Sequence, residues 1–404
     1  MPEQPQVPRV LRPRRSSPAD AVRPTRAEIN LEALRHNLRI VRKHAGEARV
    51  WAVLKADAYG HGAPAVARTL ERARVDGFCV ALIEEAVELR EAGIVAPILV
   101  MGGHYGNAYD EIVARDLIPV VHDAEQVTAF ARLVRLGHAP GPIDVHVKID
   151  TGMARLGVTM AALPEVAAKL AECREVRVRG LMTHLACADS PSDEEMADQM
   201  ARFDEATALL ARHGVRPVVR HAANSAALLR ARVRLDAVRP GLAIFGVSPR
   251  VGNDPLTREL RPVMKVRTEI VALREIEEGA SVGYGATWTA GRRSRIGTIP
   301  MGYADGLSRQ LGSCGDPARP GGHVLVRGKR AAIVGAVSMD MTMIDVTDVD
   351  GVSVRDETIV LGAQEGRLGR ESIGANEIAS QGGTIAWEVL TSVSRRVPRF
   401  YREP

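Results

Sequence analysis

The sequence predicts an α/β chain of two domains, in which a (β/α)8 TIM-like barrel is followed by a C-terminal, mostly antiparallel β domain. From Ala27 to about residue 240, short apolar runs alternate eight times with Ala- and Leu-rich segments of helical periodicity. Eight such units fit a closed barrel, whereas a doubly wound sheet would need fewer units and a GxGxxG turn after its first strand. The length of 404 residues also exceeds the usual size of one domain.

The barrel strands are predicted from apolar runs that are short and bounded by turn residues or helical segments. The predicted strands are Val50–Leu54, Gly77–Leu82, Pro97–Met101, Ile118–His122, Ile143–Ile149, Val176–His184, Pro217–His221 and the shorter Ala237–Arg239.

The helices between these strands are predicted from apolar residues that recur with helical spacing. Examples are Glu84–Ala92, Ala124–Leu136 and Ser192–His213. The last of these opens with Ser192 and has Glu195 three residues later, which is the spacing of a capping box.

The C-terminal part has a different pattern, because apolar runs there are separated by Gly, Asp and Pro turns. The runs are Val263–Leu273, Ser294–Pro300, Gly322–Arg327, Ala331–Val337 and Thr358–Leu361, and a short helix is expected near Thr384–Ser392. We therefore expect a disordered Arg- and Pro-rich tail over residues 1–25, a barrel over 26–262 and a β domain over 263–404.

Composition and charge point to an ordinary globular protein. The net charge is +5, and part of the excess lies in the N-terminal tail. Such a tail could touch nucleic acid or a membrane, but it lacks interleaved aromatic residues and is better explained as solvated. Four widely spaced cysteines show no metal-ligand spacing and fit a reducing compartment. Without a signal peptide or a long apolar run, the sequence predicts a cytoplasmic protein with no nucleic-acid or membrane partner.

Polar residues at the ends of the predicted strands should face one another, since the carboxyl ends of barrel strands form the active-site face. These residues are Lys55, Lys148, His184, His221 and Arg239. A lysine that leaves a buried strand loses hydration, so its pKa falls and its free amine can attack a carbonyl group. A surface lysine is the alternative for Lys55, but the glycines that follow it and Tyr59, four residues on, favour a site.

The segment around this lysine, VLKADAYGHG (Val53–Gly62), resembles the cofactor-attachment signature of the alanine racemase family. Further counterparts follow in the family's order: KIDTGMARLG (148–157), THLACAD (183–189), HAANSAA (221–227), VRPGLAIFG (238–246), VGYGATW (282–288), GYADG (302–306) and SMDMTM (338–343). The resemblance covers nearly the whole chain from Ala27 onward. It implies a barrel plus β domain and an isomerase that interconverts L- and D-alanine on pyridoxal 5'-phosphate, supplying D-alanine for peptidoglycan.

The resemblance implies two catalytic bases. Lys55 would hold the cofactor as a Schiff base and move the proton of the D enantiomer, and Tyr284 would serve the L enantiomer. Racemisation needs bases on opposite faces of a planar carbanion. Because an ordinary tyrosine is a weak base at neutral pH, the family pattern supplies a supporting chain from Tyr284 to His184 and Arg239. Arg239 would also donate to the pyridine nitrogen, and this separates racemases from decarboxylases, which place a carboxylate there.

The remaining cofactor contacts are also implied by the resemblance. The phosphate would be bound by Tyr59, Ser225 and the backbone amides of Gly241 and Leu242, since hydroxyl groups and amides suit a dianion. The same resemblance assigns Asn224 and Tyr303 to cofactor binding. Asn224 and Ser225 could equally cap a helix, and both roles can coexist.

Substrate contacts come from both predicted domains. Arg155 would bind the substrate carboxylate as a bidentate fork, and Lys148 would be carbamylated to orient it, with an ion pair to Asp150 as the alternative. Met339 and Asp340 would line the substrate pocket. In the family these two residues and Tyr284 reach into the partner's site, so a head-to-tail homodimer is expected.

Three positions depart from the family pattern near the expected entrance: Arg395 and Trp288 stand where tyrosines are common, and Ser338 replaces a common cysteine. They leave open a broader racemase that accepts serine, because an apolar pocket rejects one added hydroxyl poorly. A non-catalytic carrier of pyridoxal phosphate would resemble the barrel alone. A decarboxylase is disfavoured by Arg239.

Overall fold

The computed structural model describes residues 21–105, 108–190, 192–230, 233–249, 258–315 and 321–403. These residues form two compact units. The barrel unit contains the described residues of Ile29–Lys265, Gly374–Thr391 and Tyr401–Pro404. The β unit contains the described residues of Met1–Glu28, Val266–Ile373 and Ser392–Phe400.

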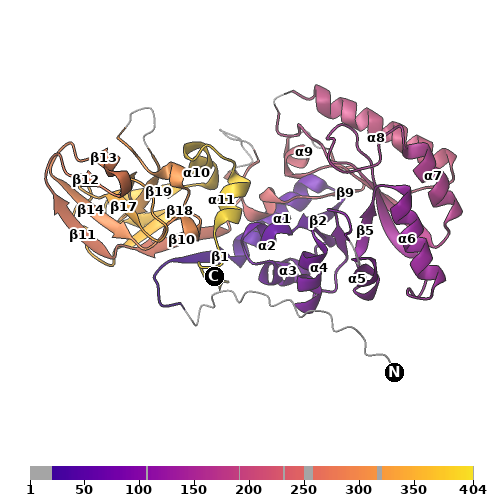
Figure 1. The fold of residues 1–404 in the computed structure, drawn as a ribbon, viewed down its shortest axis with the longest axis horizontal. Coiled ribbons are helices and arrows are strands. Elements are labelled where there is room, and N and C mark those ends of the chain that lie inside the picture. Colours follow the sequence, from indigo (N-terminus) through magenta and orange to yellow (C-terminus); the bar gives the residue numbers. More distant parts are fainter. Residues whose placement is uncertain are drawn as a thin grey trace. The chain divides into compact units, whose positions relative to one another are not determined.

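The barrel unit is a closed ring of eight parallel strands surrounded by helices, which confirms the predicted fold class (Figure 1). The ring runs in sequence order, and β9 closes it against β2 through the pair Arg49–Ala237. Its strands are β2 (Arg49–Val53), β3 (Gly77–Val80), β4 (Ile98–Val100), β5 (Ile118–Val121), β6 (Ile143–Lys148), β7 (Val176–Met182), β8 (Val219–His221) and β9 (Ala237–Val238).

The strands are largely buried, because helices cover the outer face of the ring while side chains fill the barrel interior. The exceptions are Arg49 in β2 and Arg177 and Arg179 in β7, which are exposed. The helices are α1 (Leu31–Ala45), α2 (Lys55–Tyr59), α3 (Ala63–Arg72), α4 (Ile83–Glu91), α5 (Ala108–Ala114), α6 (Ala124–Arg135), α7 (Leu163–Glu172), α8 (Glu194–Arg212) and α9 (Ser225–Leu229). Two helices from the C-terminal part of the sequence, α10 (Ala375–Gln381) and α11 (Ala386–Ser392), group with the barrel as far as Thr391.

Helix starts follow local capping chemistry, with one correction to the sequence prediction. Asn30 caps α1 and Asp123 caps α6, each accepting a backbone N–H three residues on. The predicted capping box at Ser192 is wrong, because α8 begins two residues later at Glu194. The Ser192 hydroxyl instead accepts the Glu194 amide in a turn before the helix.

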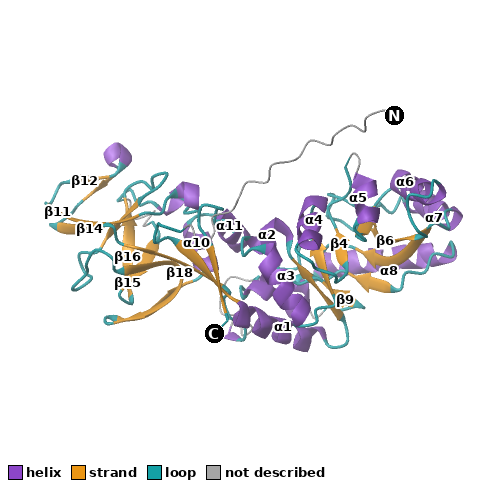
Figure 2. Ribbon diagram, turned by 90° about the horizontal axis from the view of Figure 1, so that it is seen from below, coloured by secondary structure: helices purple, strands orange, loops and turns teal. Residues whose placement is uncertain are grey.

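The β unit is built on a ten-stranded sheet, in which strands β10, β11 and β14–β19 pair antiparallel with their neighbours in this group (Figure 2). The strand order is β11-β14-β17-β16-β15-β18-β10-β1-β20, with β19 beside β18. The strands are β1 (Arg26–Asn30), β10 (Met264–Glu269), β11 (Ala272–Ile276), β14 (Ser294–Ile299), β15 (His323–Val326), β16 (Lys329–Val334), β17 (Thr342–Asp345), β18 (Glu357–Gly366), β19 (Gly369–Ile373) and β20 (Arg399–Arg402). Strand β1, which lies in the range 26–262 assigned to the barrel domain but before the first predicted barrel strand at Val50–Leu54, belongs to this sheet.

A separate two-stranded hairpin, β12 (Ser281–Val282) with β13 (Trp288–Thr289), projects its loop from the same unit. Val282 packs with Ile296 and Val334, and Trp288 lies partly buried against this cluster. The hairpin thereby fixes both ends of the short turn that carries Tyr284.

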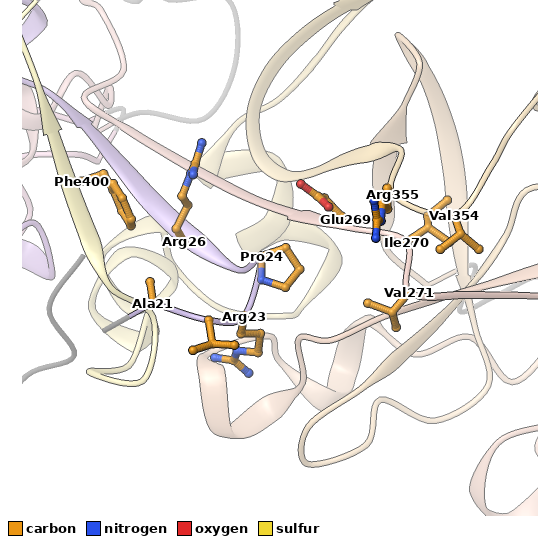
Figure 3. A pocket seen from close by; sticks show the side chains of 11 residues that line it. Ala21, Arg23, Pro24, Arg26, Glu269, Ile270, Val271, Val354, Arg355 and Phe400 are labelled. Atoms are coloured by element: carbon orange, nitrogen blue, oxygen red, sulfur yellow. The ribbon is translucent and has the colours of Figure 1, made fainter. Parts of the chain in front are cut away.

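The N-terminal segment is ordered from Arg23 onward by contacts within the β unit. Arg23 forms a two-bond ion pair with the fully buried Asp305, and Thr25 bonds Thr268 at 2.8 Å. Figure 3 shows the pocket of about 520 Å³ that this segment lines with Glu269 and Phe400. Residues 1–20 of the predicted tail lie outside the described residues.

Among the residues that the structure describes, no helix combines the length and apolar character that a membrane crossing requires. Within the same residues, no cluster of three or more His, Cys, Asp or Glu side chains could hold a metal ion.

Candidate active site

The carboxyl end of the barrel gathers basic side chains, as the strand ends predict. Lys55 follows β2, Lys148 ends β6, and Arg239 follows β9. The charges of Arg155, Arg239 and Lys55 all lower the pKa of Lys148, and those of Arg155 and Lys148 lower the pKa of His184. These groups therefore share one electropositive pocket, which suits an anionic cofactor and a carboxylate substrate.

The four residues after Lys55 form a left-handed turn. Ala56, Asp57, Ala58 and Tyr59 have φ between 50° and 56°, a conformation that L-residues avoid. Each such residue costs roughly 1–2 kcal/mol, because its Cβ crowds the following carbonyl. The turn therefore persists only because its surroundings hold it, and backbone strain of this kind is typical of functional sites.

Side-chain carboxylates hold this turn at both ends. Glu85 on α4 accepts the Ala56 amide at 2.6 Å with one oxygen and the Ala81 and Leu82 amides with the other. Asp57 accepts the Ala63 amide at 2.7 Å. The backbone next to Lys55 is thus tied directly to α3 and α4.

Two glycines let the turn pack closely against the C-terminal segment of the barrel unit. A Cβ on Gly60, which has φ 79°, would overlap the Leu390 carbonyl oxygen of α11. A Cβ on Gly62, which has φ 93°, would overlap the Tyr401 hydroxyl. Both positions therefore require glycine for conformation and for space.

The two lysines of the pocket are easier to deprotonate than ordinary lysines. Burial lowers the pKa of Lys55, the Arg155 charge lowers it further, and Glu85 partly opposes this. Burial together with the Arg155 and Arg239 charges lowers the pKa of Lys148 to about 8. Among the described residues the Lys148 side chain forms no ion pair or hydrogen bond, and the Asp150 carboxylate accepts the amides of residues 152–154 instead.

Arg239 is fully buried and is held by three hydrogen bonds. Its guanidinium donates to the His221 ring at 2.6 Å and to the carbonyl oxygens of Thr183 and Ala222 at 2.8 and 3.0 Å. Burial lowers the pKa of Arg239 to about 10, which leaves it charged at neutral pH. The expected bond from His184 to Arg239 is not formed in the described chain, because β8, which carries His221, pairs directly with β9.

His184 still belongs to the pocket. Burial and the nearby Arg239, Arg155, Lys148 and Lys55 charges lower its pKa to about 3. The ring is therefore neutral at physiological pH and can donate from one nitrogen while accepting at the other.

A small cradle of donors lies beside the lysine turn. The Tyr59 ring sits so close to Gly241 that a Cβ there would lie 2.9 Å from its Cζ atom. The Ser225 hydroxyl accepts the amides of Gly241 and Ala243 at 3.0 and 3.2 Å. The buried Leu242 amide has no acceptor among the described residues. This orphan N–H and the two hydroxyls fit the phosphate of pyridoxal phosphate.

Asn224 acts as a helix cap in this structure. Its side chain accepts the Ala227 amide at 2.9 Å at the start of α9, which places Ser225 at the first helical position. The cap thereby positions the hydroxyl of the cradle.

The β unit gathers its own candidate residues on neighbouring loops. Tyr284, in η4 (Tyr284–Ala286), is 76% exposed and Met339 is 52% exposed. The Tyr303 amide donates to the Ser338 carbonyl, so the two predicted loops lie together. Asp340 pairs with Arg396 at 2.6 Å, and Arg395 is exposed.

Sequence reasoning missed three residues of the barrel site. Glu85 fixes the turn, His221 bonds Arg239, and His146 bonds His221. His221 stood at a predicted strand end but received no role. Glu85 and His146 carried no signal, since one lies in a helix and the other inside a strand.

The chain matches two family models over most of its length. Residues 29–249 match the alanine racemase N-terminal domain, and residues 263–401 match the alanine racemase C-terminal domain. A curated relative, the alanine racemase of Sorangium cellulosum (strain So ce56), is 57% identical over 390 residues, which cover 95% of this chain and all of the relative.

Solved structures agree with the sequence matches. The alanine racemase of Streptomyces coelicolor A3(2) has a TM-score of 0.87 at 36% identity, covering 95% of this chain and 99% of that one. The alanine racemase of Bartonella henselae, solved with covalently bound pyridoxal phosphate, has a TM-score of 0.82 at 28% identity, covering 94% and 99%.

Proposed function

The chain belongs to the alanine racemase family, and from this we propose how its residues interconvert L- and D-alanine. Members of this family are isomerases that depend on pyridoxal phosphate and act on a small amino acid. The observation that carries the proposal is the Lys55 amine, which is half-buried, has a lowered pKa and lies on the same turn as the Tyr59 hydroxyl of the cradle.

The residues present fit the cofactor. Tyr59, Ser225 and the orphan Leu242 amide would bind the phosphate, and Asn224 supports them by capping α9. Lys55 would hold the cofactor covalently, and Arg239 would face its pyridine nitrogen without protonating it. When bound, the cofactor withdraws electrons from the substrate α-carbon and so makes the α-proton removable.

Lys55 then acts as a base on one face of the substrate α-carbon. Its lowered pKa makes the neutral amine available nearer neutral pH than in an ordinary lysine. Arg155 is exposed, and its guanidinium makes no ion pair or hydrogen bond within the described part of the chain. It would bind the substrate carboxylate as a fork and so orient the α-proton. A proton removed by one base leaves the α-carbon free to be reprotonated from the opposite face.

Tyr284 is proposed as the base on the opposite face, supplied by a second subunit. Its side chain is largely exposed, and Met339 and Tyr303 of the same unit are exposed as well. Apolar and aromatic groups exposed together are typical of an interface. A head-to-tail homodimer would bury them, with Met339 and Asp340 lining the partner's pocket and Tyr303 helping to hold the cofactor.

Lys148 is proposed to carry a carbamate. Its amine has a pKa of about 8, so the neutral form that reacts with carbon dioxide is more abundant at neutral pH than in an ordinary lysine. The product would be an anion among the cationic Arg155, Arg239 and Lys55 side chains, which favours it electrostatically. The carbamate would replace the missing ion pair and orient Arg155.

The compartment and the substrate range are the remaining parts of the proposal. The four cysteines are unpaired, which fits the reducing cytoplasm. Alanine is the proposed substrate, and serine is the first competitor to test because Arg395, Trp288 and Ser338 depart from the family pattern. A domain division at residues 262/263, with the tail before residue 26, also remains part of this proposal.

The test is chiral analysis of the products of purified wild type, Lys55→Ala and Tyr284→Phe, offered L-alanine, D-alanine and L-serine. We expect loss of racemisation in both variants and little change in Tyr109→Phe, which removes a hydroxyl from α5, a helix on the outside of the barrel. Full turnover by Tyr284→Phe would refute the two-base assignment. Full activity in a chain shown to be monomeric would refute the shared site.

A further inference from the structure

Inside the barrel, three buried side chains form a continuous hydrogen-bonded chain. The Arg239 guanidinium donates to Nδ1 of His221 at 2.6 Å, and Nε2 of His221 lies 2.8 Å from Nδ1 of His146. All three side chains are at most 2% exposed. Water therefore cannot substitute for any member of the chain.

Arg239 determines which atom is the donor and which the acceptor in each hydrogen bond of this series. A guanidinium can only donate, so Nδ1 of His221 must be an acceptor. Burial and the Arg239 charge lower the pKa of His221 well below its usual range, so the ring is neutral and carries its single proton on Nε2. That proton is donated to Nδ1 of His146, whose pKa is lowered to about 3 by burial and by Arg239. His146 therefore also carries its proton on Nε2.

We propose that His146 is a positioning residue: it accepts the Nε2 proton of the His221 tautomer that Arg239 requires. Without His146 that proton is buried with no acceptor, which weakens this tautomer and with it the hydrogen bond that orients the Arg239 guanidinium. With the other tautomer, His221 would present an N–H to the Arg239 N–H at 2.6 Å, and the guanidinium would have to move away. The two carbonyl bonds to Thr183 and Ala222 alone would leave it free to tilt. That the oriented guanidinium faces the cofactor rests on the proposed function, whereas the tautomer of His221 does not depend on it.

The surrounding structure fixes the position of the His146 ring. The β6–β7 register shifts between Val145 and His146, which places the ring opposite Gly180. A Cβ on Gly180 would overlap the His146 ring at Nδ1, the acceptor atom. Trp51 packs against both histidines, with ring centroids 5.3 and 6.1 Å away. The ring therefore has one position, and that position serves His221.

The first test reads the tautomers directly in the cofactor-free protein labelled with nitrogen-15 histidine, assigned by single substitutions among its 11 histidines. We expect both His221 and His146 to carry the proton on Nε2. In His146→Phe the His221 tautomer becomes mixed or inverted, while His146→Asn restores it, because the Asn Oδ1 lies where Nδ1 was and accepts the same proton. His104→Phe, another buried histidine of the barrel packed on Phe130, is the control and leaves His221 unchanged.

The second test uses Gly180→Ala, which displaces the His146 ring without removing it. If Gly180 acts through His146, the double variant Gly180→Ala/His146→Ala affects the His221 tautomer no more than His146→Ala alone. In the loaded enzyme, His146→Phe should lower kcat about tenfold, the equivalent of one lost hydrogen bond, with His146→Asn close to wild type.

An Nδ1–H tautomer at His221 in the wild type would overturn the proposal, and so would an unchanged His221 spectrum in His146→Phe. Urea unfolding of the same variants separates a loss of stability from a change in the orientation of the Arg239 guanidinium, since His146→Asn keeps the hydrogen bond to His221. A failure of the racemase assignment would leave the tautomers of the cofactor-free protein untouched, so the two hypotheses fail separately.

Discussion

The close approach between the lysine turn and α11 predicts that Gly60→Ala destabilises the protein far more than a comparable glycine substitution elsewhere. Gly60 has φ 79°, and Gly93 has φ 83° with no atom within 4 Å of a Cβ placed there. The two positions therefore share the conformational cost of an L-residue at positive φ. They differ only in the Leu390 backbone that meets the new methyl group at Gly60.

The magnitude follows from two contributions. At both positions the left-handed conformation costs roughly 1–2 kcal/mol. Alanine also lowers the conformational entropy of the unfolded chain, which offsets about 0.4–1 kcal/mol of this cost. Gly93→Ala should therefore cost about 1 kcal/mol or less. At Gly60 the methyl group must also push back the Leu390 carbonyl, whose carbon would lie at 3.3 Å, and such overpacking adds about 1–3 kcal/mol.

The assay is urea unfolding of cofactor-free wild type and both variants, followed by circular dichroism at one protein concentration. Gly60→Ala should have the lower midpoint, and it should also bind pyridoxal phosphate more slowly because the Lys55 turn is displaced. Equal midpoints for the two variants would show that α11 does not hold the turn, and the explanation of its strain would be wrong.

Three further predictions concern charged groups. Glu85→Gln puts an NH2 donor against a backbone N–H, so the free energy of unfolding should fall by about 1–3 kcal/mol, and unchanged urea stability would contradict the anchoring role. In buffer free of carbon dioxide, the free energy of unfolding of the wild type should rise between pH 8 and 10.5, because in this range the unfolded chain still holds the proton that folded Lys148 has released. Lys148→Met should lack this rise. Identical pH profiles for the two proteins would refute the prediction. Arg23→Ala should cost about 1–3 kcal/mol by leaving buried Asp305 short of two bonds, and an unchanged midpoint of urea unfolding would contradict this.

The barrel could be predicted because each of its strands is marked in the sequence by a local apolar run. The runs at Val50–Leu54 and Ile143–Ile149 are apolar, and the structure places β2 and β6 within one residue of those bounds. In the C-terminal unit the strand β17 was not predicted, since TMID is short and lies inside a motif interpreted as a pocket lining. Helix α10 was missed because ANEIASQ is brief and mostly polar.

The sequence predicted which residues lie in the site, but not which of them are hydrogen-bonded to one another. Lys55, Lys148 and Arg239 do meet at the carboxyl end of the barrel, as strand ends must. The partner of Arg239 depends on which strand lies next to β9, and that neighbour is β8 with His221 rather than β7. The left-handed turn was unpredictable for a different reason, since ADAY consists of residues that favour or tolerate right-handed structure and only distant contacts overrule them.

The contacts of Gly60 and Gly62 also set the order in which the site can be completed during synthesis. Leu390 and Tyr401, which close over the turn, leave the ribosome more than three hundred residues after Lys55. A nascent barrel emerging at about 5–20 residues per second therefore carries its lysine on an unlocked segment for many seconds. The segment that follows the cofactor lysine reaches its final packing only after Leu390 and Tyr401 have been synthesised and have docked against it.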